Sequence, residues 1–161
     1  MTIDQSTFRK VLGRFATGIT VVTALAEDAT PIGLTVNAFT SLSLDPPLVL
    51  FCLDKRNGSL DSFQEGKGFA LNMLSEEQQS LSVTFSSPVE NRFADVEMET
   101  WETGVPILTG CLANLECLID AVHEGGDHLI IVGRVENLHQ TDSGRPLLYF
   151  NGNYARIGDI D

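Results

Sequence analysis

The sequence predicts a mainly β protein of α+β class, built as a closed or nearly closed antiparallel barrel with a few flanking helices. Segments with strand character outnumber helical ones, follow one another as in hairpins, and lack the strand–helix alternation of a parallel sheet. Closure is expected because it removes the exposed edges through which open sheets associate. A length of 161 residues suits one domain, so we expect residues 1–161 to form a single unit.

The clearest helix is expected just after Ser6, with an end at Gly18. Four apolar residues in this stretch recur at the spacing of one helical face: Phe8, Val11, Leu12 and Phe15. Residues 59–65 have the composition of a second, short helix. Residues 75–78, Ser-Glu-Glu-Gln, form a capping box, which predicts the start of a third helix that continues to about Phe85.

Seven segments have the β-branched or apolar composition of strands. They are residues 19–26, 32–39, 48–53, 68–73, 111–121, 128–138 and 146–150. An extended turn is expected at Asp45-Pro46-Pro47, because proline has no backbone N–H to donate. In residues 111–121 the odd positions are apolar, whereas Asn114, Glu116 and Asp120 fall on the other face. This alternation predicts a strand with one buried face.

The charge balance excludes two classes of partner. The chain has 10 Lys and Arg against 22 Asp and Glu, and its net charge of −12 has the wrong sign for binding nucleic acid or an anionic membrane. Five acids and the single base Arg92 lie in residues 90–102, which predicts a surface loop. Three cysteines without a CxxC pair, no leader sequence and no apolar run of about 18 residues favour a soluble, cytoplasmic protein.

Several common sequence motifs of catalytic and cofactor-binding sites are absent from the sequence. There is no GxGxxG dinucleotide fingerprint, no phosphate-binding loop of the GxxxxGK[ST] type, and no GxSxG nucleophile motif. The stretch from His123 to His128 resembles HExxH, but its second histidine is one residue late and its two glycines disfavour a helix. We therefore expect no metal site.

Two polar segments are candidates for ligand binding. Small hydroxyl and amide side chains gather in and after the second strand and at one later position: Thr35, Asn37, Thr40, Ser41, Ser43 and Ser59. The alternative is an ordinary turn rich in Ser and Thr. The segment Lys55-Arg56-Asn57-Gly58-Ser59 combines adjacent cations, a glycine and a hydroxyl, as phosphate sites do. Its alternative is a solvated basic turn.

Residues 33–49, GLTVNAFTSLSLDPPLV, resemble the short-chain flavin reductases, the NAD(P)H:flavin oxidoreductases that serve two-component monooxygenases. The likeness continues in Phe8-Arg9, residues 15–22, Asn91-Arg92-Phe93, Gly126-Asp127-His128, Tyr149-Phe150 and Tyr154. It therefore covers nearly the whole chain.

This resemblance implies an FMN-binding split β-barrel of Greek-key type that forms a homodimer, with FMN or FAD near the subunit interface. Thr35, Val36, Asn37 and Ala38 would line the isoalloxazine edge, with Phe85 as a neighbouring wall. His128 would sit at the nicotinamide, with Tyr154 nearby. The ribityl chain and phosphate would contact Ser41 and the stretch from Cys52 to Ser59, which includes Lys55, Arg56 and Asn57.

The implied reaction is hydride transfer from NADH to FMN or FAD, after which the reduced flavin passes to a partner monooxygenase. NADH is expected rather than NADPH, because Asn151-Gly152-Asn153 lacks the arginine that many members carry beside the glycine. One alternative is a module that binds or carries flavin without reducing it. Another is an oxidase for a phosphorylated substrate such as pyridoxamine phosphate, although the bases beyond Lys55 and Arg56 are scattered.

Overall fold

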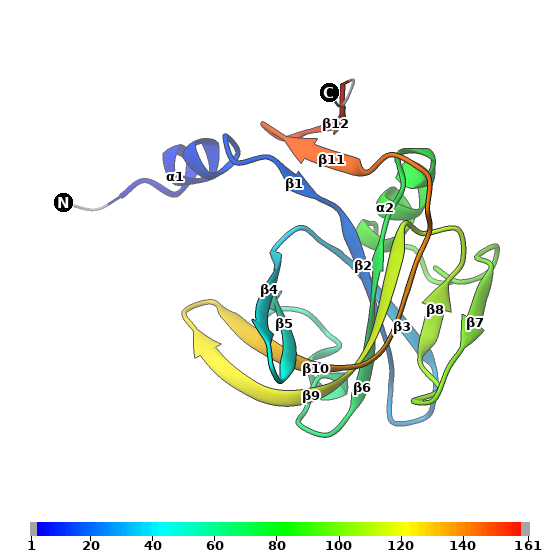
Figure 1. Cartoon of the computed structure of the whole chain (residues 1–161). Helices are drawn as coiled ribbons and strands as arrows, with labels where there is room; N and C mark the ends of the chain where they lie inside the picture. Colours follow the sequence, from blue (N-terminus) through cyan, green and yellow to red (C-terminus); the bar gives the residue numbers. More distant parts are fainter. Residues whose placement is uncertain (1–2, 159–161) are drawn as a thin grey trace.

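The computed structural model describes residues 3–158, in which antiparallel strands predominate over two α-helices. Seven strands form the main sheet in the spatial order β3-β2-β6-β9-β10-β5-β4 (Figure 1). Their bounds are β2 Thr20–Leu25, β3 Pro31–Val36, β4 Phe39–Leu44, β5 Pro47–Asp54, β6 Gly68–Met73, β9 Ala113–Gly125 and β10 His128–Gln140. The predicted mainly β, antiparallel class is confirmed.

The main sheet begins and ends with strands that are consecutive in the chain. Asn37 and Ala38 connect β3 to β4, and within residues 3–158 no ladder of hydrogen bonds pairs these two strands. A single bond from the Cys52 N–H to the Ala38 carbonyl oxygen, 3.0 Å long, ties the connection to β5. Strand pairing therefore runs through all seven strands, with β3 and β4 at the two ends, but the two end strands do not pair with each other.

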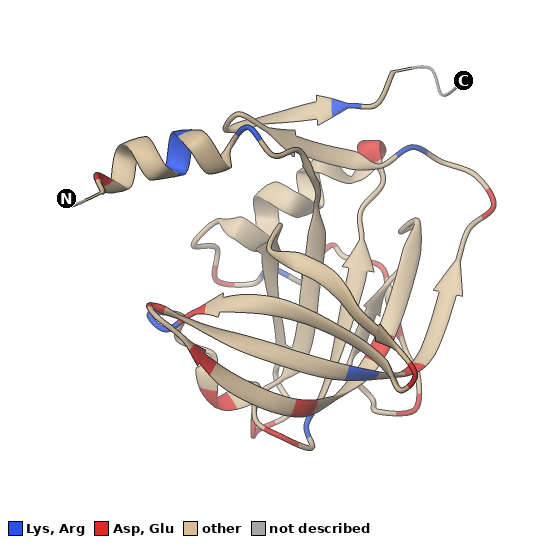
Figure 2. Ribbon diagram, turned by 60° about the vertical axis from the view of Figure 1, so that its left-hand side comes forward, with Lys and Arg blue, Asp and Glu red and all other residues tan. Residues whose placement is uncertain are grey.

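Two smaller sheets and the helices flank the main sheet. The first has the order β1-β11-β12, from Thr17–Gly18, Leu147–Phe150 and Asn153–Arg156, and the second pairs β7 Met98–Thr100 with β8 Pro106–Leu108. The helices are α1 Gln5–Leu12 and α2 Gln79–Ser86, with 3-10 turns at η1 Leu60–Ser62 and η2 Glu76–Gln78. In Figure 2, α1 stands away from the sheets.

The predicted helix boundaries are correct in one case and wrong in two. The capping box is present at Ser75 and Gln78 and leads through η2 into α2. Helix α1 begins after Asp4 rather than Ser6, because the Asp4 carboxylate accepts from the Thr7 N–H at 2.8 Å, and it ends before Gly13 rather than at Gly18. The helix expected at residues 59–65 is only the turn η1.

Three strand predictions need correction. The strand expected at residues 32–39 ends at Val36, so the Ser- and Thr-rich stretch after it is not a turn but β4, an edge strand paired with β5. The acidic loop expected at residues 90–102 contains strand β7. In β9 both faces are buried at Asn114 and Glu116, which are 4% and 0% exposed. A second buried layer, which includes Val105 and Ile107 of the β8 region, packs over the main sheet.

Asn72, on β6, is fully buried and makes four hydrogen bonds, of which one joins β8 to the main sheet and three lie within that sheet. Its amide group donates to the Val21 carbonyl oxygen at 2.9 Å and to Thr23 Oγ1 at 3.1 Å. Its Oδ1 accepts from the Leu108 N–H at 2.9 Å and from Asn114 Nδ2 at 2.8 Å. Buried polar groups are stabilising only when satisfied in this way.

In the part of the chain that the structure describes, neither helix is long and apolar enough to cross a membrane. The same part holds no group of three or more His, Cys, Asp or Glu side chains placed to bind a metal ion. All three cysteines are free, and burial raises the pKa of Cys111 to about 11 and that of Cys117 to about 12. These two thiols are protonated near neutral pH and are poor nucleophiles.

Candidate functional site

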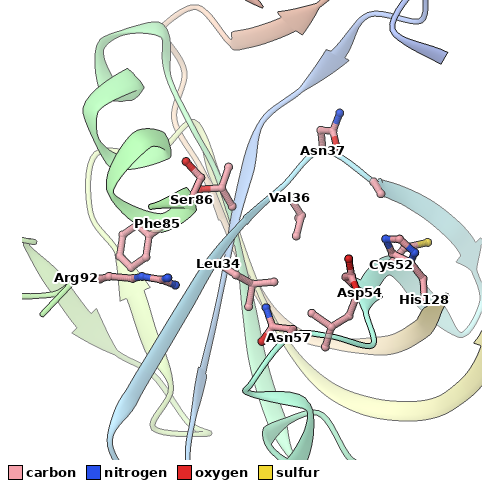
Figure 3. A pocket seen from close by; sticks show the side chains of 13 residues that line it. Leu34, Val36, Asn37, Cys52, Asp54, Asn57, Phe85, Ser86, Arg92 and His128 are labelled. Atoms are coloured by element: carbon pink, nitrogen blue, oxygen red, sulfur yellow. The ribbon is translucent and has the colours of Figure 1, made fainter. Parts of the chain in front are cut away.

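A central cavity of about 350 Å³ lies where β3 ends, β5 turns, α2 ends and the β9–β10 hairpin reaches its tip. Figure 3 shows Phe85 and Arg92 on one side of β3, with Cys52, Asp54 and His128 on the other side in this view. The described residues that line it are Leu34, Thr35, Val36, Asn37, Ala38, Cys52, Leu53, Asp54, Asn57, Phe85, Ser86, Arg92 and His128.

Gly33 permits the close packing that forms one wall of this cavity. A Cβ at this position would lie 2.3 Å from Phe85 Cε1 and 3.1 Å from Phe93 Cζ, so only glycine lets these rings approach β3. Phe85 and Phe93 meet edge-on with their centroids 5.0 Å apart. The Arg92 guanidinium then reaches β3 and donates from Nη1 to the Gly33 carbonyl oxygen at 2.8 Å.

The wall formed by the end of β3 combines apolar side chains with polar groups. Thr35 donates from Oγ1 to the Ser82 carbonyl oxygen at 2.8 Å, which joins β3 to α2. Asn37 and Ala38 follow in the connection between β3 and β4, where they are exposed. Backbone and amide groups in such a connection can bind the polar edge of a flat heterocycle, while Val36 supplies apolar contact.

The turn after β5 carries two cations, one paired beside it at the end of β5 and the other paired with the β9–β10 hairpin. Arg56 Nη2 lies 2.6 Å from Asp54 Oδ2, and hydrogen bonds from the Arg56 side chain and backbone hold the pKa of Asp54 far below its usual range. Lys55 pairs with Glu124 and also donates to the Gly126 carbonyl oxygen at 2.8 Å. Both cations therefore have partners before any ligand binds.

His128 opens β10 at the tip of the β9–β10 hairpin. Its Nδ1 lies 2.7 Å from Asp127 Oδ1, and this hydrogen bond is the main reason that the pKa of Asp127 lies below its ordinary value. The contact orients the imidazole ring. Nε2 is the other ring nitrogen, and His128 can use it to form a hydrogen bond with a ligand in the central cavity.

A smaller tyrosine cavity of about 240 Å³ shares a wall with the central cavity. Thr35, Val36, Asn37 and Ser86 line both, and the tyrosine cavity adds Ile19, Ser82, Tyr149 and Tyr154. The Ser82 and Tyr154 hydroxyl groups are hydrogen-bonded at 2.9 Å, and the two tyrosine rings meet edge-on at 5.9 Å. The smaller sheet β1-β11-β12 thus contributes to the site through Tyr154.

The structure brings most of the predicted site residues together. Eight line the central cavity: Thr35, Val36, Asn37, Ala38, Cys52, Asn57, Phe85 and His128. Tyr154 lines the tyrosine cavity, and Ser59 lines a third, outer cavity that shares Asn57 and Arg92 with the central one. Ser41, Lys55 and Arg56 line none of these three cavities.

Three lining residues were not predicted as site residues: Leu34, Ser86 and Arg92. Two further lining residues, Leu53 and Asp54, belong to the predicted stretch from Cys52 to Ser59. Arg92 had a signal, since Asn91-Arg92-Phe93 belongs to the resemblance, but no spacing connects this loop to β3. The packing of Phe93 against Phe85 makes that connection. The central cavity thus combines apolar walls with dispersed hydrogen-bond donors, which suits an organic cofactor.

Comparisons with known proteins agree with this geometry. The family model described as "Flavin reductase like domain" matches residues 12–158. The chain is 43% identical over 155 residues to HsaB, the reductase subunit of a flavin-dependent monooxygenase from Rhodococcus jostii. The matched residues make up 96% of this chain and 79% of HsaB. It is 44% identical over 154 residues to SmoA, an FMN reductase (NADH) from Agrobacterium fabrum, with 96% and 87% covered.

A solved structure is similar over nearly its whole length. The NADH:FAD oxidoreductase SgcE6 of Streptomyces globisporus, in complex with NAD and FAD fragments, superposes with a TM-score of 0.90 at 35% identity, over 96% of this chain and 93% of that one. The family model matches most of the chain, and this chain matches more than three quarters of the length of each of these relatives. The chain therefore belongs to the family of proteins with a flavin reductase like domain.

Proposed function

We propose that this protein is an NAD(P)H-dependent flavin reductase that transfers a hydride to FMN or FAD and supplies the reduced flavin to a partner monooxygenase. One observation carries the proposal: the end of β3, the turn after β5 and His128 line one cavity, in a chain 43% identical to a monooxygenase reductase subunit. SmoA and SgcE6 are both named for NADH, which favours NADH here.

The central cavity suits a flavin because apolar and polar groups alternate along its walls. Val36 and Phe85 offer apolar surface to a flat ring, while Asn37 and the backbone around Ala38 offer hydrogen-bonding groups to its polar edge. When both are bound, the dihydronicotinamide supplies a hydride and the flavin accepts it. The protein's part is to hold them in near-attack geometry and to stabilise the charge that develops.

The proposed contacts of the flavin phosphate are Asn57 and Arg92, which line both the central and the outer cavity, and Ser59, which lines the outer one beside them. Lys55 and Arg56 stay predicted phosphate contacts, and each must first leave its carboxylate partner. Ser41 stays a predicted contact from outside the cavity, on the exposed strand β4. Cys52 and Thr35 complete the proposed flavin wall, with Tyr154 beside it.

The proposed reaction is tested by mixing purified protein with FMN or FAD and NADH or NADPH while following absorbance at the nicotinamide band. We expect NADH oxidation that depends on both protein and flavin and is faster than with NADPH. Flavin binding without nicotinamide oxidation would instead indicate the alternative, a flavin-binding or carrier module. A phosphorylated-amine oxidase would consume pyridoxamine phosphate without any nicotinamide.

We also propose that residues 1–161 act as one cytoplasmic unit of split-barrel type. The curved sheet with its two consecutive end strands, β3 and β4, supports the split barrel. The three free cysteines support a reducing compartment.

A second copy of this chain is the proposed occupant of an uncovered apolar surface. Helix α1 buries none of its residues. Phe8, Val11 and Leu12 on this helix, and Phe15 shortly after it, are 52–78% exposed. The edge strand β4 adds Leu42 and Leu44, and Leu44 is 96% exposed. A largely apolar cavity of about 330 Å³ lies beside Phe15. Exposed apolar surface of this kind is typical of subunit interfaces.

The homodimer is tested by size-exclusion chromatography with light scattering. We expect the unmodified chain to elute as a dimer and the double variant Phe8→Asp, Val11→Asp to elute as a monomer, because two carboxylates would be buried in the interface. Lys10→Asp, on the opposite face of α1, is the control and should stay dimeric. A monomeric wild type would contradict the proposal.

A further inference from the structure

The outer cavity, of about 530 Å³, continues the central cavity on the far side of Asn57 and Arg92. Asn57 and Arg92 line both cavities and therefore mark the boundary between them. The Gly33 carbonyl oxygen lies beside this boundary, because it accepts a hydrogen bond from Arg92. The outer cavity is lined otherwise by Thr30 and the first three residues of β3, by Gly58 and Ser59, and by the loop at residues 89–93. A ligand longer than one flavin ring system can therefore extend from one cavity into the other.

The boundary between the two cavities carries unused hydrogen-bond donors. In the described chain Arg92 makes one hydrogen bond, to the Gly33 carbonyl oxygen, which leaves most of its guanidinium N–H groups available. Asn57 uses its Oδ1 to accept from the Ser59 N–H at 2.9 Å, and its NH₂ group has no partner among residues 3–158. A planar guanidinium beside an amide suits a pyrophosphate, whose oxygens accept several hydrogen bonds at once.

Beyond the boundary, the outer cavity has the chemistry of a nucleoside site. Pro31, Ile32, Val89 and Phe93 supply apolar surface, and packing against Phe85 fixes the Phe93 ring. Thr30 and Asn91 supply a hydroxyl and an amide group. Glu90 is the one carboxylate among its described lining residues, and Arg92 offsets its charge. An apolar wall with a few polar groups binds a purine and its ribose in this way.

We propose that the outer cavity binds the adenosine monophosphate half of FAD, so that this chain prefers FAD to FMN. The inference rests on the proposed flavin site, because FMN needs only the central cavity and the boundary. Relatives of comparable identity are named as an FMN reductase and as an NADH:FAD oxidoreductase, so membership of the family leaves this choice open. The adenylate of NADH has the same chemistry, and the test separates the two.

The test measures dissociation constants of FAD and FMN for the full-length protein by isothermal titration calorimetry without NADH. We expect FAD to bind about tenfold more tightly than FMN, because it alone fills the outer cavity. Val89→Trp should remove this preference by filling the cavity, raising the FAD dissociation constant about tenfold and changing that of FMN by less than about twofold. Thr30→Trp, at another lining position, should do the same.

Val83→Trp on α2 is the matched control, because Val83 is 46% exposed, close to the 50% of Val89, and does not line the outer cavity. It should leave both dissociation constants unchanged. Equal affinity for FAD and FMN in the wild type would overturn the inference while NADH-dependent FMN reduction still supported the proposed function. A raised KM for NADH with FMN as acceptor in Val89→Trp, with FAD affinity unchanged, would assign the outer cavity to the dinucleotide and also overturn it.

Discussion

Replacing His128 by alanine is expected to lower kcat/KM for NADH about tenfold or more, with flavin affinity changed by less than about twofold. His128 lines the central cavity from the tip of the β9–β10 hairpin, and its hydrogen bond to Asp127 orients the ring. Loss of the proposed contact between His128 and the nicotinamide would raise the barrier to hydride transfer, because the two rings must be held in near-attack geometry. Stopped-flow reduction and calorimetric titration with FMN and FAD measure the two effects separately.

His123→Ala is the control for this variant, because His123 is exposed on β9 and does not line the central cavity. It should leave both measurements unchanged. In His128→Ala the pKa of Asp127 should rise toward its ordinary value, since the hydrogen bond from His128 is the first cause of its lowering. Losses of equal size in NADH use and flavin binding would contradict a role at the nicotinamide.

Replacing Asn72 by alanine is expected to lower the free energy of unfolding by about 4 kcal/mol, from groups left unsatisfied and from the cavity created. The backbone groups of Val21 and Leu108 and the side chains of Thr23 and Asn114 would each lose a partner in a fully buried region. The variant would loosen β8 from the main sheet. Chemical denaturation followed by tryptophan fluorescence measures the change, because Trp101 packs beside Val105 and Ile107.

Asn137→Ala is the control, because Asn137 is exposed on β10 and its side chain accepts only from the neighbouring Leu138 N–H. Its effect should stay within about 0.5 kcal/mol. A loss at Asn72 no larger than the loss at Asn137 would mean that the buried network adds little to stability. Because Asn72 lies outside the three cavities, the folded fraction of the variant should keep its flavin affinity.

Local patterns predicted those elements whose cause lies within a few residues. The capping box at Ser75 and Gln78 is present, because its hydrogen bonds join groups three residues apart. The predicted helix start was wrong because Asp4, two residues before Ser6, is the N-cap residue and accepts a hydrogen bond from the Thr7 N–H. The strand at residues 32–39 was predicted too long, since nothing local indicates that the chain leaves the ladder at Asn37.

The alternation in β9 illustrates a limit of a different kind. Period-two patterning correctly indicated a strand, but burial of Asn114 and Glu116 depends on the segment that precedes β9 and packs over the main sheet. Leu108 of this segment bonds Asn114, and Thr103 donates two hydrogen bonds to Glu116. Asn114 is satisfied there by Asn72 and by the Leu108 carbonyl oxygen. A polar residue on a strand therefore indicates an exposed face only when no second layer covers it.

The sequence by itself determined the strand-rich class, which follows from local spacing, and the resemblance at residues 33–49 and in later motifs, which implied eight of the residues that line the central cavity. Only the tertiary structure decided which charges face a ligand. Lys55 and Arg56 are paired with Glu124 and Asp54, whereas Arg92 reaches β3 from a distant loop. Salt bridges and ring packing between remote segments depend on how the chain folds back on itself, and no spacing along the sequence records that.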